Sequence, residues 1–334
     1  MALRLADHWL WDHWILTNED SLDLFFLRAS RALHKPHRRH KRASIGHARS
    51  SDNGNTWELL PDALVFSDSP DFDDQAIWTG SAVRLPSGGI RLFYTGISHH
   101  DNDRLVQRIG WADAVDGVTF VRRTSKLEWQ DEAPGGDVER GKNLGAIGQA
   151  KDALAPALEA DPRWYVTADN STGDVAWRDP FVFEQDGIWH MLITAAVPAE
   201  GIGEVRGAIG HAVSRDLDTW EVQEPLVVSD TFAELECSQQ RCIDGSHYLV
   251  FSCSPRMHSH GEQGYVWLAC GETALGPFDL ENAKFLANSN VYAAQIFQDT
   301  TGDWNVTGFL TGEDSNFSGE MPDFLKLSEA EFVL

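Results

Sequence analysis

The sequence predicts an all-β protein built as a β-propeller, and three observations support this fold class. The 334 residues include 13 Trp and 28 Gly but only 4 Met, a proportion typical of many short strands joined by tight turns. A hairpin pattern recurs along the chain, and strands with alternating hydrophobicity precede it. A long amphipathic helix is hard to find. A β-sandwich with coincidentally similar hairpins is the alternative architecture.

The recurring hairpin is clearest in two copies, in which an apolar strand runs into an Asp/Gly/Asn turn and then into a strand with Trp. These copies read IGHARSSDNGNTW at 45–57 and IGHAVSRDLDTW at 209–220, and weaker copies read IGWADAVDG from 109 and WLACGETALGPF at 267–278. The strands that precede the copies include GIRLFYTG at 89–96, GIWHMLITA at 187–195 and HYLVFSC at 247–253. About four strands per unit is typical of a propeller blade.

The charge of the chain disfavours a polyanionic partner. Its 27 basic and 51 acidic residues give a net charge of −24, so we expect no binding to nucleic acid or to an acidic membrane surface. No window approaches the roughly 20 apolar residues that span a bilayer. The first residues, MALRLADHWLWDHW, carry charges where a signal peptide has an apolar core, so the sequence predicts a cytoplasmic protein.

The segment Arg28–Arg49, which contains HKPHRRHKR, is the one basic run in this acidic chain. We interpret it as a solvated loop between two strands of the first blade, with anion binding or an oligomer contact as the alternative. Its histidines match no metal-ligand spacing; they are His34, His37, His40 and His47.

The cysteines and one possible helix lead to two further structural predictions. The four cysteines fit neither a zinc site nor a disulfide framework, so we expect buried free thiols at Cys237, Cys242, Cys253 and Cys270. The segment KDALAPALEA at 151–160 is the best helix candidate, but it is short and contains proline. We therefore expect a surface excursion there, after a glycine-rich loop at 134–150.

Carboxylates precede several of the predicted strands. Asp12 lies in WLWDHW, Asp179 lies in WRDP, and Glu234 and Glu236 lie in ELEC, where alternation places both side chains on one face. The innermost strands of a propeller surround one axis, so such residues can converge although they are distant in sequence. The alternative is that they are solvated strand ends.

Four short motifs occur in an order that makes the chain similar to a known group of enzymes. They are WDHW at 11–14, WTGSA at 78–82, WRDP at 177–180 and ELEC at 234–237. With them the chain resembles, from residue 9 to about 312, the levansucrase and invertase clan of glycoside hydrolases, families 68 and 32. The resemblance implies a five-bladed β-propeller, and we expect residues 1–334 to form a single catalytic domain. Family 32 members carry a C-terminal β-sandwich, but here we expect none, which is a departure from the family pattern.

The resemblance also implies a role for each motif residue. It makes Asp12 the nucleophile, Glu236 the acid/base and Asp179 the carboxylate that stabilises the transition state. It implies that Thr79 or Ser81 hydrogen-bonds the nucleophile. The further substrate-binding residues that it implies are Trp11, Trp78, Arg178, Glu234 and Arg256, the last near an acceptor subsite. Family members with calcium have an aspartate where this chain has Ala233, so we expect neither a metal nor a cofactor.

The chemistry of retaining glycosidases explains why several carboxylates are needed. One carboxyl group attacks the anomeric carbon and a second, about 5 to 5.5 Å away, protonates the leaving oxygen. Crowding raises the pKa of at least one carboxyl group, whereas a neighbouring Arg178 keeps another ionised. An extra carboxylate against the ring hydroxyls stabilises the charge that develops on a fructosyl group.

The sequence therefore predicts a retaining β-fructofuranosidase that hydrolyses sucrose or a short fructoside through a covalent fructosyl-enzyme. The expected partner is a small-molecule fructoside. Three alternatives stay open: a levansucrase-like fructosyltransferase, an arabinanase or xylosidase of the neighbouring five-bladed clan, and a propeller that binds carbohydrate without catalysis. The sequence does not reveal the natural fructoside or the oligomeric state.

Overall fold

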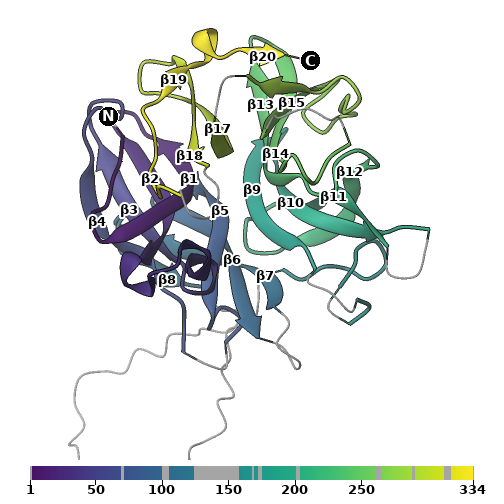
Figure 1. Ribbon diagram of the computed structural model, residues 1–334, viewed down its shortest axis with the longest axis horizontal. Coiled ribbons are helices and arrows are strands. Elements are labelled where there is room, and N and C mark those ends of the chain that lie inside the picture. The colour runs from purple at the N-terminus through teal and green to yellow at the C-terminus, as the bar shows by residue number, and fades with distance from the viewer. Residues whose placement is uncertain are drawn as a thin grey trace, which may run out of the picture.

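The computed structural model describes residues 2–68, 71–99, 105–123, 158–167, 169–171, 175–200, 204–259, 265–287, 290–311 and 317–333. These residues form five antiparallel sheets. Figure 1 shows the sheets arranged around one central axis. The predicted fold class, a five-bladed β-propeller, is confirmed, and the described residues contain no C-terminal β-sandwich.

Each blade takes consecutive strands of the chain, and its first strand lies nearest the axis. Blade 1 has β1 (His8–Thr17), β2 (Leu22–Ser30), β3 (Ser44–Ser50) and β4 (Glu58–Leu64). Blade 2 has β5 (Ala76–Arg84), β6 (Ile90–His99), β7 (Leu105–Ala114) and β8 (Val121–Arg122). Blade 3 has β9 (Trp177–Gln185), β10 (Ile188–Pro198), β11 (Val205–Ser214) and β12 (Glu221–Ser229).

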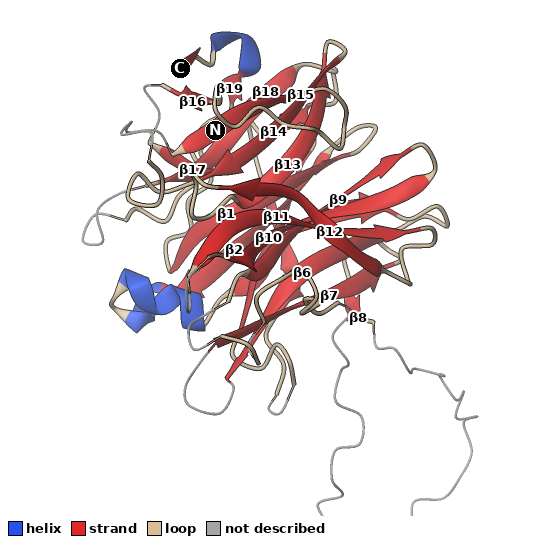
Figure 2. Ribbon diagram, turned by 90° about the vertical axis from the view of Figure 1, so that its right-hand side faces the viewer, coloured by secondary structure: helices blue, strands red, loops and turns tan. Residues whose placement is uncertain are grey.

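The last two blades share the C-terminal part of the chain. Blade 4 has β13 (Glu236–Ile243), β14 (Ser246–Ser252), β15 (Val266–Gly271) and β16 (Lys284–Leu286), with β20 (Phe332–Val333) added at its outer edge. Blade 5 has β17 (Val291–Gln298), β18 (Trp304–Leu310) and β19 (Leu325–Lys326). Three short 3-10 helices complete the described elements: η1 (Arg31–Leu33), η2 (Pro36–Lys41) and η3 (Leu327–Glu329). Figure 2 shows that strands dominate and that the helical turns lie at the periphery.

The repeated hairpins occupy the same place in successive blades, as predicted. The four copies fall on β3, β7, β11 and β15, the third strands of blades 1 to 4. In three of them an aspartate closes the turn by accepting a backbone N–H from a threonine. These bonds join Thr56 to Asp52 at 2.8 Å, Thr119 to Asp116 at 2.7 Å and Thr219 to Asp216 at 2.7 Å. Each repeat therefore covers the third strand of a blade and the turn that follows it, and this turn explains the Asp and Gly residues of the repeat.

The ring closes by contacts between the two ends of the chain. The innermost strands pack one against the next, and β17 packs against β1. Leu3 pairs with Met321 in an isolated bridge, and His13 Nε2 lies 3.2 Å from Thr307 Oγ1. Because β20 returns to blade 4 after β19 has joined blade 5, the last two sheets are also tied to each other. Closure of this kind leaves no blade without a neighbour on either side.

The prediction for the cysteines needs correction, and the prediction for 134–160 falls mostly outside the described residues. Cys237 and Cys253 are buried and free, as expected, but Cys242 and Cys270 are free and exposed, because both lie near the outer ends of their strands. The glycine-rich segment 134–150 lies outside the described residues. Of the helix candidate at 151–160 only the last three residues are described, and Leu158 there forms an isolated bridge with Ile109.

Among the described residues, none belongs to a helix with the length and hydrophobicity needed to cross a membrane. The hydrophobic core is divided into clusters that lie between neighbouring sheets. The largest fully buried side chains include Trp11, Trp177 and Trp267, one each from blades 1, 3 and 4. These bulky side chains fill the wedge-shaped spaces between blades, which holds the inner strands around the axis.

Candidate active site

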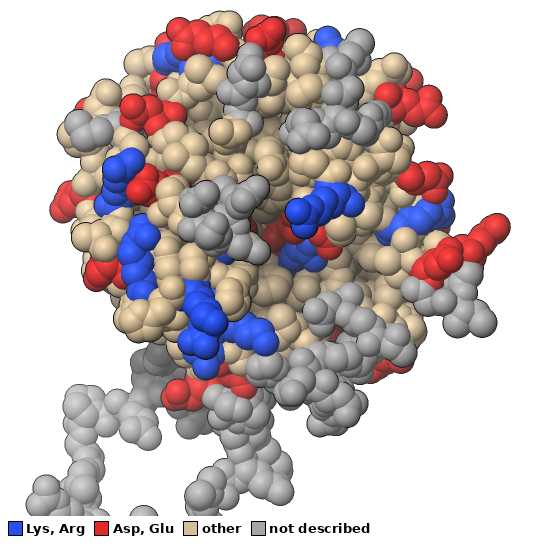
Figure 3. Space-filling view, in the orientation of Figure 1, with Lys and Arg blue, Asp and Glu red and all other residues tan. Residues whose placement is uncertain are grey.

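A pocket of about 440 Å³ opens where the first strands of the blades converge. In the space-filling view of this face, acidic and basic side chains lie together inside a central hollow (Figure 3). All five inner strands contribute residues to it, as do η2 and three further strands, β2, β7 and β18. The lining residues are Trp11, Asp12, Leu27, Arg39, His40, Trp78, Thr79, Gln107, Arg178, Asp179, Glu234, Glu236, Cys237, Tyr292 and Phe309.

Every inner strand carries a β-bulge at the pocket. Pairing with the second strand of the blade shifts register within 10–13, 78–80, 178–181, 236–239 and 292–295. Three residues at these bulges, Asp179, Cys237 and Ala293, have left-handed backbone angles, with φ of 57°, 51° and 49°. A bulge bends a strand and turns its side chains away from strict alternation. The bulges therefore direct side chains from all five blades toward the axis.

Arg178 connects three of the carboxylates. Its Nη2 lies 2.7 Å from Glu236 Oε1 and 3.0 Å from Glu234 Oε1, and its Nε lies 3.6 Å from Asp179 Oδ2. Burial opposes the charge of Arg178, but the three carboxylates outweigh it and raise the pKa of the guanidinium well above its ordinary value. The cation is thus permanently charged and fixes the geometry of its partners.

Asp12 lies in the same pocket on β1. It accepts a hydrogen bond from the Thr79 hydroxyl, which comes from the bulge of β5. Burial raises the pKa of Asp12 to about 7, and the charges of Asp179 and Glu236 act in the same direction. The Thr79 hydrogen bond and the Arg39 charge oppose this shift. Asp12 therefore titrates near neutral pH.

Asp179 is held by three groups from blades 3 and 4. Its Oδ2 accepts hydrogen bonds from Thr194 Oγ1 at 2.9 Å and from the Cys237 backbone N–H at 3.2 Å. Burial raises the pKa of Asp179 to about 6, although the Arg178 cation counteracts it. These fixed donors leave Asp179 little rotational freedom, so it presents one defined face to the pocket.

Glu236 is clamped from two sides. Arg178 Nη2 binds one carboxylate oxygen, and the Tyr292 hydroxyl donates to the other. Sequence reasoning missed Tyr292, and also Arg39, His40 and Gln107, which line the same pocket. Tyr292 could have been found because it lies near the start of the first strand of its blade, as Asp179 and Glu236 do.

Two predicted binding residues lie elsewhere. The Ser81 hydroxyl accepts the backbone N–H of Val182 at 3.1 Å and does not line the pocket, so Thr79 alone contacts Asp12. The bulge at 78–80 accounts for this difference, because it breaks the alternation that would place both hydroxyls together. Arg256 is exposed on the loop after β14 and lines a different hollow, together with Arg206 and Asp230.

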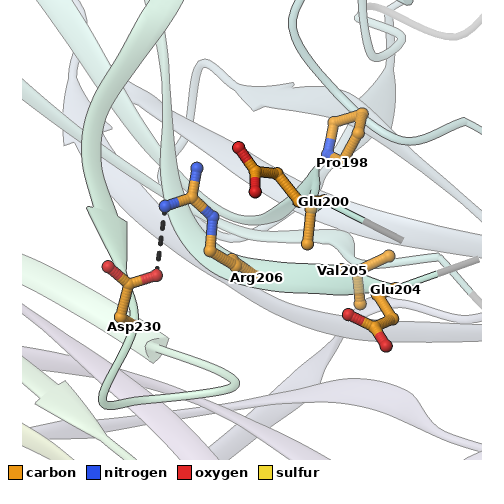
Figure 4. Close-up of a pocket in the computed structure, with 7 residues that line it drawn as sticks. Pro198, Glu200, Glu204, Val205, Arg206 and Asp230 are labelled. Atoms are coloured by element: carbon orange, nitrogen blue, oxygen red, sulfur yellow. Dashed lines mark hydrogen bonds and ion pairs between the residues drawn. The ribbon is translucent and has the colours of Figure 1, made fainter.

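A second hollow has a volume of about 780 Å³ and shares Arg206 and Asp230 with the hollow that Arg256 lines. Figure 4 shows the residues of this second hollow. Arg206 Nη1 lies 3.1 Å from Asp230 Oδ1, Glu200 lies beside Arg206, and the Glu204 carboxylate points away from this ion pair. None of the clustered carboxylates lines this hollow. It is larger than the axial pocket but lacks converging groups that could do chemistry, so we assign the candidate active site to the axial pocket.

The basic segment is more than the solvated loop that the sequence suggested. Part of it forms η2, from which Arg39 and His40 reach the pocket. His47, by contrast, is buried on β3 and binds Asp23 Oδ1 at 2.8 Å. Among the described residues, no group of three or more His, Cys, Asp or Glu side chains has the arrangement of a metal site.

The fold and the carboxylate cluster are those of a carbohydrate-active enzyme, and comparison with known proteins identifies which kind. Residues 25–134 and 159–330 match the family described as the glycosyl hydrolases family 32 N-terminal domain. The protein belongs to this family. The relatives and structural neighbours of the chain are glycoside hydrolases and fructosyltransferases, so the protein is an enzyme of this kind.

Two curated relatives show partial similarity. The chain is 26% identical over 183 residues to a sucrose-6-phosphate hydrolase of Staphylococcus xylosus and 28% identical over 194 residues to an acid beta-fructofuranosidase of Vigna radiata. These matches cover 51% and 55% of this chain, but only 35% and 28% of the two relatives. The chain thus corresponds to about a third of each relative's length.

Solved structures share the fold over nearly the whole chain. The inulosucrase of Halalkalicoccus jeotgali has a TM-score of 0.69 and 21% identity, covering 98% of this chain and 87% of its own. The Bacillus subtilis levansucrase has a TM-score of 0.66 and 18% identity, covering 98% and 86%. At such identities the likeness establishes the five-bladed propeller.

Proposed function

We propose that this protein is a retaining β-fructofuranosidase that cleaves sucrose or a short fructoside. The observation that carries the proposal is the meeting of Asp12, Asp179 and Glu236, from three different blades, in one pocket. A surface arrangement of acids would not need the bulges, the shared arginine and the buried donors that hold these groups. The propeller itself is proposed to carry the whole catalytic machinery.

In the first step, the Asp12 carboxylate attacks the anomeric carbon of the fructosyl group. The glycosidic C–O bond breaks as Glu236 transfers its proton to the leaving oxygen, which leaves a covalent fructosyl-enzyme. In the second step, Glu236 removes a proton from water, the water oxygen attacks the anomeric carbon, and the Asp12 carboxylate is released. The Thr79 hydroxyl orients Asp12 for both steps.

The remaining pocket residues support this chemistry. Asp179 faces the reacting sugar as a fixed carboxylate and stabilises the positive charge that develops in the transition state. Trp11 and Trp78 form walls of the pocket and exclude water from one side of the sugar. Arg178 and Glu234 hold Glu236 and the sugar in place.

A sugar acceptor in place of water gives fructosyl transfer by the same steps, so a levansucrase-like transferase is the closest alternative. We expect incubation with sucrose, raffinose, kestose, levan and inulin to release free sugars. Equal release of glucose and fructose from sucrose indicates hydrolysis, whereas a deficit of fructose indicates transfer. Cleavage of aryl arabinosides or xylosides without cleavage of any fructoside would contradict the proposal. Absence of all cleavage would favour a binding propeller.

A further inference from the structure

Gln107 lines the axial pocket but has no part in the reaction proposed above. It lies near the start of β7, the third strand of blade 2, and its side chain is 9% exposed. It also lines a neighbouring hollow of about 320 Å³, to which β7, the chain that precedes β9, and Trp177 contribute. Gln107 therefore lies at the border of the axial pocket.

The carbonyl end of the Gln107 side chain is anchored by blade 3. Its Oε1 accepts the backbone N–H of Trp177 at 3.1 Å and lies 3.5 Å from Arg178 Nη1. Both neighbours are donors, so the oxygen of the amide, and not its nitrogen, must face them. These two contacts therefore fix the orientation of the whole planar amide.

The nitrogen end of the same amide is left to bind another molecule. Gln107 Nε2 carries two N–H groups, and neither has a hydrogen-bond partner among the described residues. The nitrogen is accessible from the pocket, unlike the buried and unpaired Nε1 atoms of Trp14 and Trp111. Gln107 thus presents a donor of fixed direction to whatever occupies the pocket.

Arg178 lies between Gln107 and the proposed reacting groups. In the proposed mechanism, Asp12, Asp179 and Glu236 surround the fructosyl group. Arg178 Nη2 lies 2.7 Å from Glu236 Oε1 and its Nε lies 3.6 Å from Asp179 Oδ2, whereas its Nη1 faces Gln107. The amide is therefore one side chain further out than the carboxylates, where it can reach the part of the substrate beyond the fructosyl group.

We propose that Gln107 determines specificity for the leaving part of the substrate, by donating hydrogen bonds from its amide nitrogen to a hydroxyl oxygen of the leaving sugar. This inference rests on the proposed function. Because the carbonyl end is already anchored, the side chain loses little freedom when the sugar binds. A hydroxyl oxygen has the lone pairs to accept such a bond. A leaving group without hydroxyls gains nothing from Gln107.

The test compares sucrose with fructosyl fluoride, whose leaving group is a fluoride ion and not a sugar. Gln107→Leu removes both ends of the amide, whereas Gln107→Glu keeps an oxygen for Trp177 and Arg178 but removes the N–H donors. The added carboxylate raises the pKa of its neighbours, so the pH-independent kcat/KM is taken from a full pH profile. In both variants we expect this value to fall about 10-fold for sucrose and to change less than about twofold for fructosyl fluoride.

Gln239→Leu is the matched control. Gln239 is a buried glutamine that also joins two blades, since its Nε2 donates to the Ala294 carbonyl at 2.5 Å and its Oε1 accepts the Ile296 N–H at 3.2 Å. It does not line the axial pocket. The control should lower the melting temperature and leave the ratio between the two substrates unchanged.

Two results would overturn the inference, because they are the results expected if Gln107 only fixes Arg178 in place. One is wild-type cleavage of sucrose by Gln107→Glu, which keeps the anchoring oxygen. The other is an equal loss for sucrose and fructosyl fluoride in Gln107→Leu.

If the wild type cleaves neither substrate, the proposed function fails and Gln107 is judged separately by calorimetry with sucrose. Sucrose binding that is weakened about 10-fold in both Gln107 variants but kept in Gln239→Leu would still support a sugar-binding amide. Binding that is absent in the wild type, or equal in all four proteins, would refute it.

Discussion

The base and the mouth of the axial pocket are built in opposite ways. At the base, Asp12, Asp179 and Glu236 come from three inner strands, each held by hydrogen bonds from a neighbouring blade. At the mouth, Arg39 and His40 come from one short connection between β2 and β3. Side chains supported by several sheets are rigid, whereas those on a single connection tolerate change in sequence.

Each region of the pocket therefore has its own expected influence on activity. In the proposed mechanism, the base contacts the reacting carbon and the leaving oxygen of any fructoside. Side chains at the mouth contact the parts of the substrate that lie beyond them. Changes at the base should therefore affect all fructosides alike, whereas changes at the mouth should alter the ratio between fructosides with different leaving parts. Four predictions test this division, beginning with the largest expected effect.

Asp12→Asn should reduce turnover of every fructoside by about 10³-fold or more, because an amide cannot form the covalent fructosyl-enzyme. The loss should be equal for sucrose and kestose, measured by sugar release. Thermal melting should show a folded protein. A variant that retained wild-type activity, while Glu236→Gln lost it, would require a different nucleophile.

Glu236→Gln should reduce turnover of sucrose by about 10²- to 10⁴-fold, because the leaving oxygen loses its proton donor. The first step should suffer much less with an aryl fructoside, whose leaving group departs without protonation. Burst kinetics with the aryl substrate measure that step directly. A uniform loss for both kinds of leaving group would contradict the assignment of Glu236 as the acid.

Thr79→Val should shift the acid limb of the kcat/KM profile to higher pH. Asp12 has a pKa of about 7 and must be ionised to attack, so activity falls as the pH drops through this value. The Thr79 hydrogen bond lowers the pKa of Asp12, so its removal leaves a smaller ionised fraction at each pH below the limb. Ser81→Ala, whose hydroxyl binds Val182 instead, is the control and should leave the limb in place.

Chelation should have the smallest effect. Because Ala233 stands where the resemblance places a calcium ligand, we expect dialysis against EDTA to change neither the rate of sucrose cleavage nor the melting temperature. Wild-type protein redialysed into calcium serves as the comparison. A large loss that calcium restores would reveal a metal site.

The sequence predicts much of this architecture because its signals are local. The turn after the third strand of a blade is closed by an aspartate side chain, as at Asp52 and Asp216. The same residue types therefore recur in the sequence and can be recognised as repeats. Asp12, Asp179 and Glu236, which are proposed to be catalytic, also lie in short motifs on the first strands of their blades. By contrast, Tyr292 lies in no recognised motif, and its contact with Glu236 spans 56 residues of sequence.

What the sequence determined by itself was therefore the blade pattern, the carboxylates and the presence of a basic segment. The tertiary structure decided which hydroxyl meets Asp12, since a bulge in β5 aims Thr79 at it and Ser81 away from it. It also decided where the basic segment lies. Hydrophobic alternation and turn composition act between near neighbours, whereas bulge geometry and the docking of η2 against Trp78 depend on how the blades pack around the axis.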